Sequence, residues 1–126
     1  MNRENLNFQI AIASLVGLLA LTVVQIMALF AEVEPHPPEF VGPFLGAVVA
    51  LGFVCIVLIY GKSRVGIALS ILFSVTNIPN VGLHKLWTHP AANVLWPIVI
   101  LGSVLIVALL VSSIILLRKE QLNSTV

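Results

Sequence analysis

Residues 8–30 read FQIAIASLVGLLALTVVQIMALF, an apolar run without a single charged side chain. A bilayer core about 30 Å thick needs about 20 helical residues to cross it, so this run can span a membrane as one helix. A signal peptide is the alternative, because Arg3 precedes the run. The run is longer than the usual apolar region of about 7–15 residues, and no A-x-A site follows it. We therefore predict a retained transmembrane helix.

Three more apolar runs follow, at about residues 43–60, 65–84 and 94–117. Unpaired backbone groups are very costly in lipid, and these runs lack the apolar and polar alternation of a barrel strand, so each should be a helix. The predicted fold class is all-α: a polytopic integral membrane protein, an antiparallel bundle of four transmembrane helices. Residues 1–126 would form a single transmembrane domain.

The composition supports a membrane protein. Hydrophobic residues make up 60% of the chain and charged residues only 9%, whereas soluble domains carry about 25% charged residues. The net charge of +1, without a basic patch interleaved with aromatics, argues against nucleic acid as a partner. The single cysteine, Cys55, excludes an internal disulfide and CxxC chemistry, and it is best interpreted as a small buried hydrophobe.

The connections predict the orientation in the membrane. An acidic, proline-rich loop covers residues 31–42, a tight turn covers residues 61–64, and a polar tail covers residues 118–126. Cytoplasmic loops carry an excess of lysine and arginine. With the N-terminus inside, five basic residues lie inside and only Lys85 lies outside; the five are Arg3, Lys62, Arg64, Arg118 and Lys119. We therefore predict a protein of the plasma or cytoplasmic membrane with both termini cytoplasmic.

Small residues recur at one-turn spacing along the predicted helices. Gly42, Gly46 and Ala50 do so in the second helix, and residues 66, 70 and 74 do so in the third. Close backbone approach across small residues drives helix association in lipid, so these stripes are expected to pack inside the bundle. The tight turn makes the second and third helices neighbours.

Polar residues inside the predicted membrane region lie toward its outer side. Gln25, Asn77 and Asn80 are the predicted helix–helix polar contacts, and Gln25 could be the cross-helix partner of Asn77. Pro79 lies between the two asparagines. It predicts either a kink whose loose backbone groups bond to Thr76 and Asn77, or a helix break that lines a transport path.

The outer side also holds all three histidines. His36, His84, His89 and Glu34 are the candidate metal ligands, because imidazole and carboxylate groups suit copper or zinc. No HExxH or H-x-x-x-H spacing is present, so the simpler alternative is that these residues solvate the loops at the lipid headgroups.

No catalytic constellation is visible, and the function predicted first is a small non-catalytic subunit, accessory or scaffold, of a larger membrane protein complex. Intramembrane charged residues usually mark catalysis or ion pathways, and the predicted spans contain no Asp, Glu, Lys or Arg. Its partners would be the lipid bilayer and other membrane subunits or a second copy. One alternative is an outer-face membrane protein that binds copper or zinc, the only cofactors suggested. A further alternative is a small homodimeric transporter built around residues 77–80.

Overall fold

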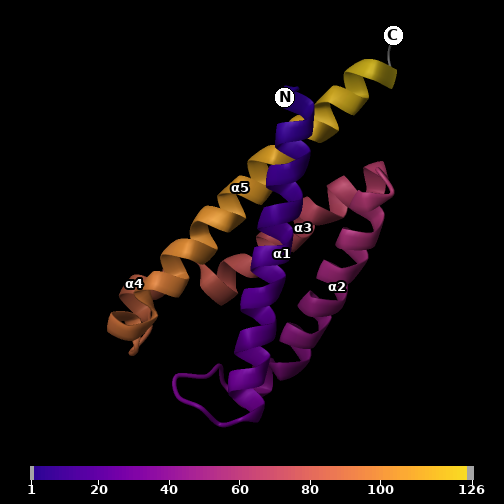
Figure 1. The fold of residues 1–126 in the computed structure, drawn as a ribbon. Coiled ribbons are helices and arrows are strands. Elements are labelled where there is room, and N and C mark those ends of the chain that lie inside the picture. Colours follow the sequence, from indigo (N-terminus) through magenta and orange to yellow (C-terminus); the bar gives the residue numbers. More distant parts are fainter. Residues whose placement is uncertain (1, 125–126) are drawn as a thin grey trace.

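The computed structural model describes residues 2–124, and all its regular elements are helices (Figure 1). They are α1 (Arg3–Phe30), the 3-10 turn η1 (Glu39–Val41), α2 (Gly42–Tyr60), α3 (Arg64–Val81), the short α4 (Lys85–Thr88) and α5 (Ala92–Ser124). Four stretches are long and apolar enough to cross a membrane: α1, η1 with α2, α3 with α4, and α5. The prediction of an all-α bundle of four transmembrane helices is confirmed, and the chain is an integral membrane protein in contact with lipid.

The four long helices form a ring. α1 packs against α2 and α5, and α3 packs against the same two helices, while α1 and α3 lie across the ring from each other. Both termini and the turn between α2 and α3 lie at one end of the bundle, here called the terminal end (Figure 1). Residues 31–38 and α4 lie at the opposite end, here called the loop end.

Two helices extend beyond their predicted limits. α1 begins at Arg3, where the Asn2 side chain caps it by accepting a hydrogen bond from the Glu4 N–H at 3.4 Å. α5 continues through residues 118–124 of the predicted polar tail; residues 125 and 126 lie outside the described part. The extension has a simple reason, because this segment contains neither proline nor glycine to end the helix. α3, by contrast, ends at Val81 rather than near residue 84.

The ends of α1 and α2 are closed in the same way. Glu32 and Lys62 adopt left-handed backbone conformations, with φ of 53° and 55°. The Val33 N–H then donates to the Ala28 carbonyl at 3.0 Å, and the Ser63 N–H donates to the Leu58 carbonyl at 2.9 Å. These bonds satisfy carbonyls that a helix end would otherwise leave unpaired, so each chain reversal costs little backbone hydrogen bonding.

Small residues bring the backbones of α2 and α3 into contact. A Cβ atom added to Gly66 of α3 would lie 2.6 Å from the Leu58 Cβ and 2.8 Å from the Ile59 backbone nitrogen, both on α2. Ser70 and Ser74, one and two turns along α3, are fully buried. The prediction that this stripe packs inside the bundle is therefore confirmed.

The corresponding prediction for α2 is wrong for Gly46 and Ala50, although Gly42 at the start of the helix packs near Leu29 of α1. A Cβ added to Gly46 would meet no atom within 4 Å, and Ala50 is exposed. The buried side of α2 follows another register, formed by Leu45, Val48, Gly52, Cys55 and Ile59. Because successive buried positions lie three or four residues apart, Gly46 and Ala50 fall on the outward face.

A hydrogen bond crosses the centre of the ring. The Thr22 hydroxyl of α1 lies 3.1 Å from the Asn77 Oδ1 of α3, and both residues are almost completely buried. The Thr22 Oγ1 also lies 2.9 Å from the Leu18 carbonyl oxygen, and the Asn77 Nδ2 donates to the Phe73 carbonyl at 2.8 Å. The cross-helix partner of Asn77 is thus Thr22, one turn before the expected Gln25, which is half-buried.

We predict that alanine substitutions at Gly66 and at Gly46 have different effects on the free energy of unfolding. Gly66→Ala should lower the free energy of unfolding by about 1–3 kcal/mol, because the new methyl group meets the α2 backbone. Gly46→Ala should leave it unchanged or raise it by up to about 1 kcal/mol, because the space is open and alanine favours a helix. Unfolding in detergent, followed by circular dichroism, would measure both. Equal losses in the two variants would contradict the packing.

We also predict energetic coupling between Thr22 and Asn77. In a double-mutant cycle of Thr22→Val and Asn77→Leu, the coupling should be about 0.6–1.7 kcal/mol, from the average to the largest value found for hydrogen bonds between transmembrane helices. Gln25→Leu combined with Asn77→Leu is the control and should be additive within about 0.5 kcal/mol. Coupling in the control cycle alone would show that the wrong partner has been assigned.

Candidate functional site

A cavity of about 450 Å³ lies at the loop end of the bundle and is here called the loop-end cavity. All four membrane-crossing stretches contribute to it. The lining residues are Gln25, Pro35, His36, Pro37, Pro38, Val41, Phe44, Pro79, Asn80, Lys85, His89 and Leu95. Apolar and polar side chains are therefore combined in one concave site, as in small-molecule sites generally.

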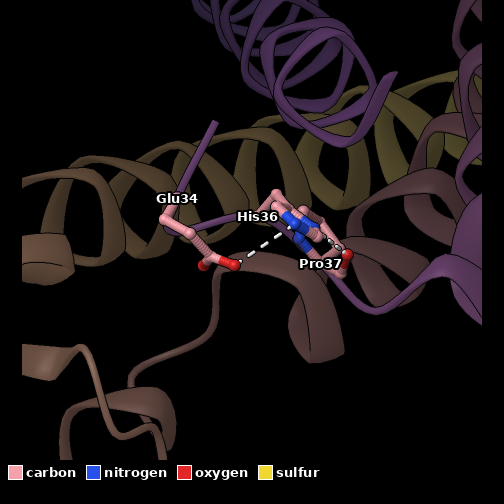
Figure 2. A network of polar contacts seen from close by, with 3 residues as sticks. All are labelled: Glu34, His36 and Pro37. Atoms are coloured by element: carbon pink, nitrogen blue, oxygen red, sulfur yellow. Dashed lines mark hydrogen bonds and ion pairs between the residues drawn. The ribbon is translucent and has the colours of Figure 1, made fainter. Parts of the chain in front are cut away.

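The loop after α1 presents His36 to this cavity. Prolines at positions 35, 37 and 38 restrict the backbone on both sides of the histidine, and the Glu34–Pro35 bond is cis. The His36 Nδ1–H donates to the Pro37 carbonyl at 2.8 Å, and Nε2 lies 3.3 Å from the Glu34 carboxylate (Figure 2). Glu34 is 80% exposed, whereas His36 is only 20% exposed, so the carboxylate faces water and the ring faces the protein.

The segment around α4 supplies two further polar groups. Lys85 begins α4, and His89 follows its last residue. The His89 Nδ1 accepts a hydrogen bond from the Ala91 N–H at 3.1 Å. Since Nδ1 is the acceptor, the proton of the neutral ring belongs on Nε2, which becomes a hydrogen-bond donor.

α3 continues through Pro79 and places its two asparagines differently. Asn77 lies in the core, whereas Asn80 lines the loop-end cavity. The Thr76 hydroxyl and the Asn77 amide both donate to the Phe73 carbonyl, at 2.8 Å. Thr76 and Asn77 were predicted to bond to the backbone group that Pro79 leaves unpaired. Proline has no N–H, so that group is the carbonyl four residues earlier, which belongs to Val75 and not to Phe73.

The four predicted metal ligands do not come together. Glu34 and His36 are paired, and His36 and His89 line the same cavity. His84 is exposed in the turn before α4, and its carbonyl accepts a hydrogen bond from the Thr88 hydroxyl. Within residues 2–124, no three histidine, cysteine or acidic side chains are close enough to hold a metal ion. The reason is local, because α4 lies between His84 and His89. The His84 carbonyl accepts from Thr88 and the His89 ring accepts from Ala91, so both histidines are held by neighbouring residues of the chain.

A larger cavity, of about 590 Å³, lies along α5 and the start of α1. Its lining is mostly aliphatic and includes Ile10, Ile100, Val104 and Val107. A surface of this kind at membrane depth is suited to contact with acyl chains, and it offers little to orient a polar ligand. Of these two cavities, the loop-end cavity is therefore the one with charged and hydrogen-bonding side chains suited to a polar ligand.

Two residues of this architecture had no distinct signal in the sequence. Thr22 lies inside an apolar run, where a threonine usually bonds to its own helix, and only the position of α3 makes it a cross-helix donor. Lys85 was noted only for its charge, and the fold of α4 is what brings it to the cavity. A lysine close to the end of an apolar run is the one clue that could have indicated its role.

The loop-end cavity is rich in hydrogen-bond donors. Lys85, His89 and Asn80 offer N–H groups, and of the described side chains that line the cavity none is acidic. Such a site can bind and orient an acceptor-rich group.

Comparison with known proteins adds no relative, since the chain matches no family model, no curated protein and no solved structure.

Proposed function

We propose that this protein is a non-catalytic subunit of a larger membrane protein complex, held to its partner through the outward face of α2. The open small-residue segment of that face carries the proposal. We define the α2 face as the exposed stripe formed by Gly46, Ala47, Ala50, Phe53, Val54 and Val57. Its members recur every three or four residues, so they share one side of the helix.

The other glycines of the membrane region support this reading of Gly46. An added Cβ would lie 2.9 Å from Leu105 at Gly17, 2.8 Å from Leu19 at Gly52 and 2.6 Å from Val81 at Gly102. At these positions the bundle uses a missing side chain for close packing. Gly46 has the same small-xxx-small spacing to Ala50, but its neighbouring space is open. In lipid, this arrangement favours the close approach of another helix.

The extent of burial agrees with this choice of helix. Only 28% of the most apolar stretch of η1 and α2 is buried within the chain, compared with 44% for α3 and α4. The share is 33% for α1 and for α5, so η1 with α2 has the smallest share of buried residues among the four stretches. The partner we propose is a transmembrane helix of another subunit, and a second copy of this chain is the competing occupant.

We expect Ala50→Leu to release the partner. Purified from its native cells in a mild detergent, the tagged protein should bring down a larger membrane protein at constant stoichiometry. A leucine at position 50 should block backbone approach and reduce the yield of that partner at least about tenfold, the effect of about 1.4 kcal/mol. Ala20→Leu, at an exposed alanine of α1, is the matched control and should retain it.

Two outcomes would overturn the proposal. A homo-oligomer without another subunit would assign the α2 face to self-association. Equal partner yields from Ala50→Leu and Ala20→Leu would show that the α2 face is not the contact.

We further infer that the terminal end is cytoplasmic and the loop end faces the other side. The basic residues Arg3, Lys62, Arg64, Arg118 and Lys119 belong to the terminal segments and the turn at that end. Lys85 alone belongs to the loop end. An excess of this kind favours the cytoplasmic side.

Cysteine labelling tests this orientation. In a Cys55→Ala background, Glu39→Cys should react with a membrane-impermeant maleimide in intact cells, because Glu39 is exposed at the loop end. Asn123→Cys, exposed near the C-terminus, should react only after lysis. The reverse pattern would show that the loop end is cytoplasmic.

A further inference from the structure

We propose that the loop-end cavity binds the phosphate group of an amphiphilic ligand, with the phosphate held by Asn80, Lys85 and His89 and the apolar part against the proline loop and Phe44. This site is separate from the α2 face. The proposal rests on an uncompensated cation, an unpartnered donor, a fixed histidine tautomer and an apolar wall in the same cavity.

Lys85 supplies the positive charge. It lines the cavity, is only partly exposed, and has no acidic neighbour among the described residues that line it. Among the described residues, the Glu34 carboxylate contacts His36 Nε2, and no carboxylate forms an ion pair with Lys85. A partly buried ammonium group near the end of a membrane-crossing stretch is stabilised by a bound anion.

Asn80 supplies a hydrogen-bond donor without a partner. The residue is 9% exposed, and its Nδ2 has no acceptor among the described residues. A buried amide donor without an acceptor is unfavourable in a low-dielectric environment. Asn80 lines the cavity, and a rotation of its side-chain amide would turn this buried donor toward an acceptor on a bound ligand.

The hydrogen bonds of His89 and His36 determine which ring N–H groups can bind a ligand. His89 uses Nδ1 to accept the Ala91 N–H, which leaves Nε2–H as a donor. His36 uses Nδ1–H on the Pro37 carbonyl, and its Nε2 faces Glu34 (Figure 2). His89 is therefore available to a ligand, while His36 is held by the loop.

The geometry of these donors favours phosphate. They come from α3, from the start of α4 and from the residue after it, so they approach the cavity from separate segments. A tetrahedral phosphate accepts hydrogen bonds in several directions, and lysine binds it as a point charge. A carboxylate has enough lone pairs for three donors, but they lie in one plane and match donors from separate directions less well.

The apolar lining of the loop-end cavity and its depth below the end of α1 indicate that the ligand is an amphiphile. Prolines 35, 37, 38 and 79 line the cavity with Val41, Phe44 and Leu95, and they form an apolar surface. Gln25 lies five residues before the end of α1, so the cavity reaches about 8 Å below the helix end. Lipid phosphates lie at this level of a bilayer, and a soluble organic phosphate could enter from the water side.

The test is a titration of the purified chain in detergent, followed by native mass spectrometry. The probes are dioleoylphosphatidylglycerol, dioleoylglycerol, which lacks the phosphate, and inorganic phosphate. We expect one phosphatidylglycerol to bind per chain and dioleoylglycerol to bind much more weakly. Binding of inorganic phosphate in place of the lipid would also support the phosphate site, and it would identify the source as a soluble phosphate.

Variants locate the binding. Asn80→Leu and Lys85→Met should each weaken phosphatidylglycerol binding about tenfold or more, the usual effect of removing one hydrogen bond to a charged group. Lys85→Arg should restore it because the charge remains. Lys119→Met, the same substitution at the other end of the bundle, should bind as the unaltered chain does. Circular dichroism checks that each variant is folded.

Two results would overturn the proposal. One is equal binding of phosphatidylglycerol and dioleoylglycerol, because the phosphate would then contribute nothing. The other is unchanged phosphatidylglycerol binding by both folded variants, Lys85→Met and Asn80→Leu, because the lipid would then bind elsewhere on the chain. Neither result depends on the α2 face, so failure here and loss of the proposed subunit contact are distinguishable.

Discussion

The structure depends on one constraint: lipid offers no hydrogen bonds, so the chain must pair its own polar groups wherever it crosses the membrane. The long helices pair the backbone, and left-handed residues Glu32 and Lys62 close two of their ends. The buried hydroxyl groups of Ser70 and Ser74 follow the same rule, since each donates to the carbonyl one turn earlier, whereas the buried Ser113 hydroxyl has no partner among the described residues. Among the hydrogen bonds described, the Thr22 contact with Asn77 joins opposite helices through side chains.

Close packing complements this sparse polar interior. Lipid chains are as apolar as the helix surfaces, so helices gain little from merely hiding apolar area and gain more from fitting closely. Gly66 allows the backbones of α2 and α3 to approach each other. Gly46 and Ala50 offer the same opportunity on the outside of α2, where the chain leaves it unused. Internal packing and the proposed subunit contact thus rest on one physical principle.

The two ends of the bundle differ chemically. The terminal end gathers most of the basic residues, and the loop end combines a proline-stiffened loop with Lys85, His89 and Asn80 around one cavity. Polar groups are tolerated at the loop end because the helices reach the bilayer surface there, where water and headgroups can solvate them. A partly buried cation and a donor without an acceptor remain at this end, and they suit it to binding rather than to packing.

The sequence alone was sufficient for the four spans, the positions of the connections and the uneven distribution of charge, because hydropathy and proline act locally. The small-residue stripe of α3 also predicted its buried face, but only the tertiary structure decided which face of α2 is buried. Core and lipid are equally apolar, so the residue pattern does not reveal which side of α2 is buried or that Thr22, rather than Gln25, meets Asn77. The cavity likewise required the fold, because residues from α1, the proline loop, α3 and α4 become neighbours only when the four helices close into a ring.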